Sequence, residues 1–335
     1  MIEKAHILKQ ERRFDVSRRT LLTAIGGGAV ALSALPALAS EAAVSVVTTT
    51  SQVGDAVRVI GGDHVLVEAL MGEGVDPHTF RQTRTDIVEL NNADIVFANG
   101  LRLEAQLVEL LEALSAQKPV VAVAEKAPAD RLLADSEYEG QFDPHVWMDV
   151  ALWAIALEGV RDGLIEVDGD RSGEYEAAFE AYRSDLAKLD EYVRTVLSSV
   201  PQEKRVLVSA HDAFGYFGNA YDFDVVGIQG LSTESEAGLE RVEALVDLIV
   251  ERKLPAVFVE TSVADRNVRA LIEGAASRGH AVQIGGSLFS DAMGAPGTYE
   301  GTYVGMIDHN ATVIASALGG DVSAGGWQGK LGTNG

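Results

Sequence analysis

The sequence predicts an α/β protein with two lobes that one long, rigid helix connects. Short β-branched runs alternate with helix-length amphipathic segments from residue 44 to residue 123. The same alternation starts again at residue 205, and a long periodic segment at residues 173–200 separates the two series. Strands that alternate with helices indicate a parallel sheet in each series, so we expect two Rossmann-like (β/α) lobes.

The first lobe is predicted to span residues 40–170. Its first strand is a β-branched run at residues 44–50, which ends in small polar residues suited to cap a helix. An acidic loop at residues 135–140 separates its last predicted strand from its last predicted helix. The remaining elements are expected as helices at 52–60, 81–91 and 104–114, strands at 64–70, 95–98 and 120–123, and a helix that begins near 149.

Residues 171–200 are predicted to form the connecting helix. Apolar side chains recur in steps of four and three from Tyr175 to Val200, and charged residues occupy the positions between them. This pattern makes one apolar stripe on a helix about 40 Å long. A coiled-coil dimer is the alternative, but the stripe is short and α/β segments flank it. We therefore expect a stiff connector that packs against both lobes and ends at Pro201.

The second lobe is predicted to span residues 201–318. The Gly-rich residues 319–335 are expected to form a loose tail. A helix is expected to open at His211, directly after the first strand of this lobe. The other elements are expected as strands at 205–210, 223–228, 256–259 and 282–284, helices at 236–251, 264–277 and 301–318, and a loop at 287–294.

Composition narrows the possible functions. The chain has 335 residues, of which 47% are hydrophobic, and this is enough for two cores. It carries 27 Lys and Arg against 50 Asp and Glu, so its formal charge is −23 and no basic patch follows a phosphate backbone. Nucleic-acid binding is therefore disfavoured. The absence of cysteine excludes disulfides and thiolate chemistry, so a metal would be held by histidine and carboxylate.

Residues 1–39 have the pattern of a cleaved signal peptide. Arg18-Arg19 precede an apolar run at residues 21–38, and small residues close the segment at Ala39. The paired arginines indicate twin-arginine export. An uncleaved membrane anchor is the alternative, although glycines and Pro36 interrupt the run. No cysteine stands at the junction, so we expect a free periplasmic protein without a lipid anchor.

The triplet Asp76-Pro77-His78 recurs as Asp143-Pro144-His145. Proline fixes its own φ and restricts the residue before it, so each imidazole leaves the backbone in a limited range of directions. A site that holds two histidines at fixed angles around a small ligand would use this arrangement twice. The repeat therefore indicates a binding site for a small ligand such as a metal ion.

Three histidines share one kind of position. His78, His145 and His211 each lie just beyond a predicted strand or on a loop that opens a helix, where open α/β sheets bind ligands. They divide between the two halves, so a shared site would lie in the cleft between lobes. Taken singly, His211 could cap its helix and His78 could bond a loop carbonyl. Solvation or local hydrogen bonding accounts for the other four, His6, His64, His280 and His309.

Four motifs follow one another along the chain: Val75-Asp76-Pro77-His78-Thr79-Phe80, Phe142-Asp143-Pro144-His145-Val146-Trp147-Met148-Asp149, Ser209-Ala210-His211-Asp212-Ala213-Phe214-Gly215-Tyr216-Phe217 and Leu288-Phe289-Ser290-Asp291. In this order they resemble the motifs of the periplasmic metal-binding proteins of zinc and manganese ABC importers, the TroA-like cluster 9 group. The resemblance covers essentially the whole chain after residue 39. It implies that one Zn²⁺ or Mn²⁺ ion is bound by His78, His145, His211 and Asp291, with Asp76 as an auxiliary carboxylate that coordinates or acts from just outside the ligands. It also implies a monomer that delivers the ion to a membrane permease.

The sequence leaves the choice of metal open. Three neutral imidazoles with one carboxylate suit zinc, and added carboxylate ligands suit manganese. Many zinc-specific members of the family carry a His-rich insertion where this chain has the acidic residues 127–142, and members dedicated to manganese often have glutamate in place of His211. The stiff connector predicts small lobe movements, and proton competition predicts that affinity falls as the pH drops through the range near 6.5.

An exported metal-dependent hydrolase is the main alternative function. It would need an open coordination position and a general base, for which Glu260 or Asp76 are candidates. The sequence has no His-Glu-x-x-His helix, and a fully ligated ion leaves no place for substrate. A surface adhesin is a third class, but it would not explain the ligand set. Metal capture without catalysis is therefore the function that the sequence favours.

Overall fold

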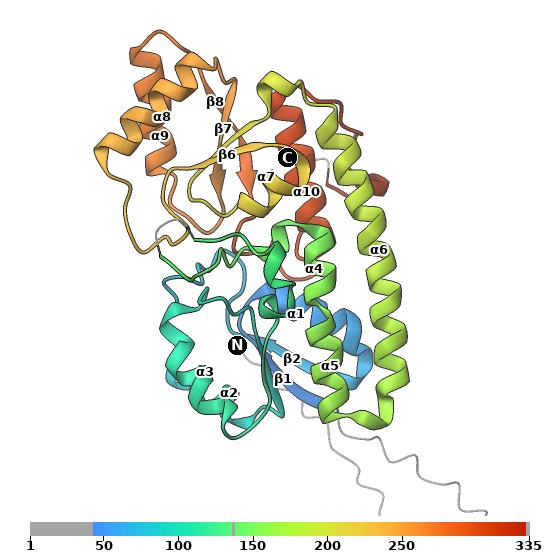
Figure 1. The fold of residues 1–335 in the computed structure, drawn as a ribbon. Helices are drawn as coiled ribbons and strands as arrows, with labels where there is room; N and C mark the ends of the chain where they lie inside the picture. Colours follow the sequence, from blue (N-terminus) through green and yellow to red (C-terminus); the bar gives the residue numbers. More distant parts are fainter. Residues whose placement is uncertain (1–42, 136–137, 333–335) are drawn as a thin grey trace, which may run out of the picture. The chain divides into compact units, whose positions relative to one another are not determined.

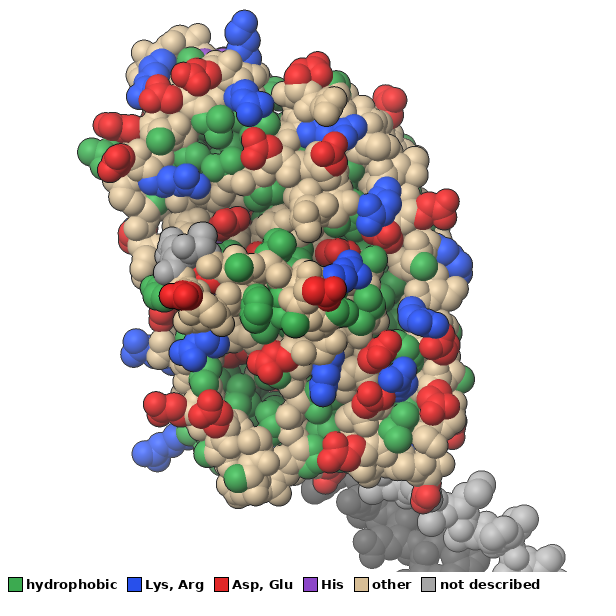
Figure 2. Space-filling view, in the orientation of Figure 1, with side chains coloured by type: hydrophobic (Ala, Val, Ile, Leu, Met, Phe, Trp, Pro, Cys, Tyr) green, Lys and Arg blue, Asp and Glu red, His purple; other side chains and the backbone are tan. Residues whose placement is uncertain are grey.

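The computed structural model describes residues 43–135 and 138–332. The predicted signal peptide at residues 1–39 lies outside the described residues. Within the two described ranges, no helix is both long and apolar enough to cross a membrane. On the face shown in Figure 2, acidic and basic side chains are interspersed rather than gathered into a basic stripe.

A four-stranded parallel sheet in the order β2-β1-β3-β4 forms the core of the first lobe (Figure 1). Helices α1 and α5 pack on one face of this sheet, and α2 and α3 pack on the other. Every residue of β3 is buried, as expected for a parallel strand that is covered on both faces. The bounds are β1 Val44–Thr48, α1 Ser51–Gly61, β2 Val65–Ala69, α2 Arg84–Asn92, β3 Ile95–Ala98, α3 Val108–Ser115, β4 Val120–Ala122, α4 Val150–Ala156 and α5 Glu158–Val167.

The second lobe contains two pairs of parallel strands. Strand β5 pairs with β6 and β7 pairs with β8, and β5 lies against β7. Helices α8 and α9 pack on each other beside these strands (Figure 1). The bounds are β5 Val206–Ser209, α7 Gly215–Tyr221, β6 Asp224–Gly227, α8 Leu239–Glu251, β7 Ala256–Glu260, α9 Arg266–Ser277, β8 Gln283–Leu288 and α10 Tyr303–Leu318.

The long helix α6, Ser172–Ser198, connects the lobes as predicted. It contacts α1, α4 and α5 of the first lobe and α10 and α7 of the second lobe. The apolar stripe is buried along its whole length, so the connector is packed against both lobes. The stripe consists of Tyr175, Phe179, Tyr182, Leu186, Leu189, Val193, Val196 and the flanking Val200.

Two helices begin later than the sequence predicted, each after a segment whose backbone N–H groups donate to a buried carboxylate. Glu104 was expected to open a helix, but its buried carboxylate accepts the N–H groups of Asn99 and Gly100, and α3 begins at Val108. His211 was also expected to open a helix directly. Its backbone N–H instead donates to Glu260, and α7 begins only at Gly215.

Strand β8 is longer than the predicted strand at 282–284, and it includes two glycines. Gly285 and Gly286 lie inside the strand, next to a shift in register between Val257 and Phe258 of β7. A Cβ on Gly285 would lie 2.7 Å from the Phe258 ring, so glycine permits this close approach. The predicted loop at 287–294 therefore starts within a strand.

The expectation of a loose tail is wrong for the described part of residues 319–335. Gly319 ends α10 with φ +86°, a left-handed conformation that favours glycine. The backbone N–H of Trp327 then donates to both carboxylate oxygens of Asp308 at 2.9 Å. The side chain of Trp327 packs against the main core, so this segment is anchored to α10.

Candidate metal centre

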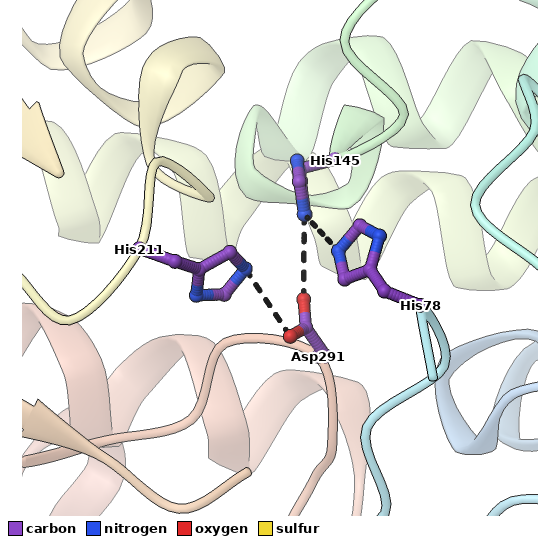
Figure 3. Close-up of side chains that lie close together, drawn as sticks. All are labelled: His78, His145, His211 and Asp291. Atoms are coloured by element: carbon purple, nitrogen blue, oxygen red, sulfur yellow. Dashed lines mark hydrogen bonds and ion pairs between the residues drawn. The ribbon is translucent and has the colours of Figure 1, made fainter. Parts of the chain in front are cut away.

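The structure brings His78, His145, His211 and Asp291 together (Figure 3). His78 lies in the segment that follows β2, and His145 lies directly before a short 3-10 turn at Val146–Met148. His211 follows β5 and Asp291 follows β8, so each lobe contributes two residues. His78, His211 and Asp291 thus come from segments that follow parallel strands, and His145 comes from a loop that opens a short helical turn.

The four side chains face a common point with spacings that suit one metal ion. One ligand atom from each residue lies within 4.8 Å of the others. The shortest separations are 3.3 Å between the Nε2 atoms of His78 and His145, 3.4 Å from His145 Nε2 to Asp291 Oδ1, and 3.2 Å from His211 Nε2 to Asp291 Oδ2. Ligands at 2.0–2.2 Å from a tetrahedral zinc ion are about 3.4 Å apart.

The centre leaves buried polar atoms without hydrogen-bond partners. His145, His211 and Asp291 are at most 2% exposed, and His78 is 4% exposed. Neither His211 Nε2 nor Asp291 Oδ1 makes a hydrogen bond among the described residues. Buried polar atoms in folded proteins are nearly always paired, so an ion with positive charge is the ligand that completes this arrangement.

Both Asp-Pro-His triplets form the same backbone turn. In each, the aspartate Oδ1 accepts the backbone N–H of the histidine two residues later at 2.9 Å. Proline cannot donate, so this turn satisfies the first available N–H and fixes the start of the histidine side chain. The sequence repeat therefore corresponds to a repeated local structure.

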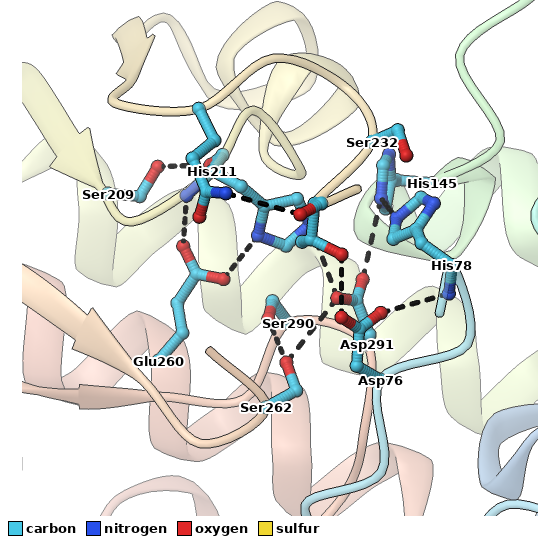
Figure 4. A network of polar contacts seen from close by, with 12 residues as sticks. Asp76, His78, His145, Ser209, His211, Ser232, Glu260, Ser262, Ser290 and Asp291 are labelled. Atoms are coloured by element: carbon cyan, nitrogen blue, oxygen red, sulfur yellow. Dashed lines mark hydrogen bonds and ion pairs between the residues drawn. The ribbon is translucent and has the colours of Figure 1, made fainter. Parts of the chain in front are cut away.

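Two of the histidine rings are hydrogen-bonded to carboxylates. The sequence did not identify these carboxylates as their partners. Asp143 Oδ1 lies 2.7 Å from Nδ1 of His145, and Glu260 Oε2 lies 2.5 Å from Nδ1 of His211. An Nδ1–H that donates to a carboxylate leaves the Nε2 lone pair for a metal and makes the imidazole a stronger ligand. The interaction of Glu260 with His211 (Figure 4) is therefore a ring-orienting contact, and this carboxylate is not available as the base of the alternative hydrolase.

Asp76 lies beside the cluster but is not one of its four members. Its Oδ1 accepts the N–H of His78 (Figure 4). Its Oδ2 accepts the hydroxyls of Thr79 at 3.1 Å and Thr233 at 2.6 Å. Both oxygens are thus engaged in hydrogen bonds.

The histidines differ in their affinity for protons. Burial lowers the pKa of His145, but Asp143 and Asp291 outweigh burial and raise this pKa to about 9. Burial also lowers the pKa of His211, and Asp291 and Glu260 raise it well above its ordinary value. Burial, together with the neighbouring His145 and His211, lowers the pKa of His78 to about 3, against the opposing effect of Asp291. Without a metal, protons therefore occupy the two carboxylate-backed rings and not His78.

Asp291 carries the negative charge of the cluster. Burial alone would raise its pKa, but His211, His145 and His78 together lower the pKa well below the ordinary value for aspartate. The hydroxyl of Ser262 lies 3.4 Å from Asp291 Oδ2, and the same hydroxyl lies 3.0 Å from that of Ser290. Asp291 is thus ionised and oriented before any ion arrives.

Contacts between the lobes hold the site in place. Trp147 of the first lobe donates from Nε1 to the carbonyl oxygen of Ser290 in the second lobe at 3.0 Å. Tyr216 of the second lobe donates to the carbonyl oxygen of Asp143 at 2.9 Å. Asn99 Nδ2 donates to the carbonyl oxygen of Pro144 at 3.1 Å and so supports the second triplet from within the first lobe. None of these contacts was predicted from the sequence, because no local pattern marks them.

The remaining described histidines lie away from the cluster and have local partners. His64 bonds Glu174, His280 bonds the carbonyl oxygen of Leu254, and His309 bonds that of Ser287. These contacts agree with the expectation that local hydrogen bonding accounts for them. His6 lies outside the described residues.

Comparison with known proteins gives consistent matches. The family model for the periplasmic component A of zinc-uptake complexes matches residues 46–317. The zinc-binding protein TroA of Treponema pallidum is 48% identical over 273 residues, which are 82% of this chain and 88% of that protein. The manganese-binding lipoprotein MntA of Bacillus subtilis is 45% identical over 275 residues, 82% of this chain and 90% of that protein. The solved structure of periplasmic zinc-binding TroA from Treponema pallidum superposes with a TM-score of 0.80 at 47% identity, covering 82% of this chain and 99% of that one.

Proposed function

Because the chain belongs to the family of the periplasmic component A of zinc-uptake complexes, we propose that it captures one divalent metal ion, Zn²⁺ or Mn²⁺. It then delivers this ion to the membrane permease of an ABC-type importer. The ligands are His78, His145, His211 and Asp291, and the protein acts as a monomer. Capture and delivery, rather than catalysis, is the function.

The observation that carries the proposal is the convergence of four buried ligand atoms from two lobes within 4.8 Å. Each lobe brings two ligands, so neither lobe alone holds the ion. A bound ion therefore bridges the lobes. The names of two relatives, zinc-binding TroA and manganese-binding MntA, support this use of the site.

The donor set favours zinc over manganese in affinity. Three imidazoles and one carboxylate are usual zinc ligands, and at most N/O sites zinc binds more tightly than manganese. Asp76 would be the added carboxylate for a manganese site, but its oxygens are engaged with His78, Thr79 and Thr233. We infer that Zn²⁺ is the ion bound more tightly, and the ion transported also depends on which metal is available.

Ion binding moves the lobes only slightly. Helix α6 packs on both lobes along its buried stripe, and Trp147 and Tyr216 join the lobes directly beside the site. A wide hinge opening would break all of these contacts at once. Release to the permease therefore depends on a local change at the ligands rather than on separation of the lobes.

The site of action is the periplasm. The twin-arginine pattern in residues 1–39 directs export of the chain, with cleavage after Ala39. MntA of Bacillus subtilis is named a lipoprotein, whereas this sequence contains no cysteine that a lipid could modify. We propose a free periplasmic protein.

The test is the metal content of the exported protein. Protein purified from the periplasm is expected to contain one zinc or manganese ion per chain, measured by plasma mass spectrometry, and His145→Ala is expected to contain almost none. His309→Ala is the matched control, because His309 lies outside the cluster and bonds a carbonyl oxygen. Equal metal content in His145→Ala and the parent, or metal-dependent hydrolysis of an ester or phosphoester, would contradict the proposal.

A further inference from the structure

We infer that residues 229–238, here called the inter-lobe strap, form a latch that sets how fast the metal enters and leaves the site. The strap lies between β6 and α8 of the second lobe, and it reaches the first lobe at Asp76 and Gln106. This inference rests on the proposed metal-binding function. It assigns Asp76 the role of a positioning residue that joins the lobes and does not coordinate the ion.

The latch consists of two hydrogen bonds between the lobes. The hydroxyl of Thr233 donates to Oδ2 of Asp76 at 2.6 Å, and Nε2 of Gln106 donates to Oε1 of Glu234 at 2.8 Å. The first is partly buried and the second is exposed. Hydrogen bonds to a charged acceptor are stronger than neutral ones, and exposure to water weakens them. The Thr233–Asp76 bond is therefore the principal contact.

Hydrogen bonds within the strap stabilise the conformation in which Thr233 faces the first lobe. The side-chain amide of Gln229 donates to the carbonyl oxygens of Thr233 at 3.3 Å and Ser235 at 2.9 Å. Gln229 is itself only 6% exposed. At the end of the strap, Arg241 donates to the carbonyl oxygen of Gly227 at 2.6 Å. A loop with these internal bonds loses little conformational entropy when the latch closes.

The strap covers the route to the site. A cavity of about 660 Å³ has one wall formed by the strap and another formed by Leu101, Arg102 and Ala105 of the first lobe. His78 also lines this cavity, whereas Asp291 and His211 do not. An ion that moves between solvent and the cluster through this cavity must pass between the strap and the first lobe. Breaking the latch opens this passage while all four ligand side chains remain present.

Asp76 couples the latch to one ligand. Its Oδ1 accepts the backbone N–H of His78 (Figure 4), while its Oδ2 accepts the hydroxyl of Thr233. The same carboxylate therefore fixes the start of the His78 side chain and the closed position of the strap. When Thr233 moves away, the Asp76 carboxylate loses its hydrogen bond to the second lobe, and the segment that carries His78 gains freedom.

Two threonines that donate to the same oxygen provide a matched test. Thr79 also donates to Asp76 Oδ2, at 3.1 Å, but from within the first lobe. Thr233→Val removes the inter-lobe bond with little change in side-chain volume, Thr79→Val removes the intra-lobe bond, and Thr233→Ser keeps a hydroxyl. Each variant is loaded with Zn²⁺, and release is followed by stopped flow with excess chelator. Capture of Zn²⁺ by the metal-free protein and the thermal midpoint are measured in parallel.

Thr233→Val is expected to release Zn²⁺ roughly tenfold faster than the parent, as expected for the loss of one charge-assisted hydrogen bond. Capture should accelerate as well, so the Kd changes less than the release rate. Thr79→Val and Thr233→Ser should remain within about twofold of the parent.

Equal acceleration in Thr79→Val and Thr233→Val would overturn the latch and leave the proposed function standing. Unchanged release in Thr233→Val would do the same. A parent protein that binds no Zn²⁺ or Mn²⁺ would overturn the proposed function, and the latch with it. A lowered thermal midpoint in Thr233→Val with parental kinetics would also count against the latch, because the bond would then serve folding alone.

Discussion

The two Asp-Pro-His turns begin alike and end differently. In both, the aspartate Oδ1 accepts the backbone N–H of the following histidine at 2.9 Å. In the second turn, the same oxygen of Asp143 also accepts the ring Nδ1–H of His145. In the first turn, Asp76 makes no such contact with the ring of His78, and its other oxygen reaches Thr79 and Thr233.

The difference shows that the surroundings, and not the motif, decide what a carboxylate does. Asp143 is 3% exposed and enclosed beneath Tyr216, so its charge acts on the nearest imidazole. Asp76 lies at the border of the lobes, where a threonine from the strap can approach it. The Asp143 turn therefore raises the proton affinity of a ligand, His145, and the Asp76 turn connects the lobes through Thr233. The second lobe uses the same kind of contact as Asp143 and His145, because the Glu260 carboxylate bonds Nδ1 of His211.

The largest expected effect that separates the two turns is the pH dependence of metal affinity. The pKa of His145 is raised to about 9 and that of His211 is also raised, whereas the pKa of His78 is lowered to about 3. Below pH 9 the metal must displace a proton from His145, so affinity falls as the pH falls. Each displaced proton lowers the apparent affinity about tenfold per pH unit, so the displacement of protons from both His145 and His211 lowers it about 10,000-fold between pH 8 and pH 6.

Competition titrations of Zn²⁺ against a chelator of known pH dependence measure this slope. The loss extends upward from the range near pH 6.5 that the sequence suggested, because the carboxylates stabilise the protonated rings. His78 contributes nothing to the slope in this range, because it is already neutral. Affinity that is constant from pH 8 to pH 5 would contradict histidine ligation altogether.

The next effect separates the two aspartates directly. Asp143→Asn is expected to weaken Zn²⁺ binding by about 10–100-fold, because a neutral amide no longer orients and polarises the His145 ring. Asp76→Asn is expected to change the Kd by less than about tenfold and to act mainly on the rates of capture and release. Equilibrium titration and stopped-flow release of Zn²⁺, performed on both variants, measure the two quantities. A larger loss of affinity in Asp76→Asn than in Asp143→Asn would mean that Asp76 coordinates the ion.

The sequence predicted the parts of the site that local patterns specify. The repeated triplet marked His78 and His145, and the position after a strand marked His211. Asp291 required the family resemblance, because one carboxylate among 50 acidic residues carries no local mark. Glu260 was noticed only as a possible base, since its partner His211 is 49 positions away in the chain.

The parts of the fold that local sequence patterns specify were also predictable. Helical periodicity specified α6 nearly to the residue, since a buried stripe of apolar side chains is a property of the segment itself. Tertiary contacts decided the places where prediction failed. Thr49 donates to the Glu104 carboxylate ahead of α3, Phe258 approaches Gly285 inside β8, and Asp308 anchors the tail at Trp327.

The smallest expected effect tests whether the Asp143 turn depends on its tight surroundings. Gly215 begins α7, and a Cβ added there would lie 2.8 Å from Asp143 Oδ2. Gly215→Ala therefore pushes on the carboxylate that holds His145, and we expect Zn²⁺ affinity to fall about 3–10-fold, within the usual cost of overpacking a buried site. Gly173→Ala near the start of α6 is the control, because nothing lies within 4 Å of its added Cβ. This control should bind Zn²⁺ as the parent does and gain up to about 1 kcal/mol of stability from helix propensity. If Gly215→Ala matches Gly173→Ala in chelator competition, Asp143 can shift without disturbing His145, and the contrast between the two turns rests on charge alone.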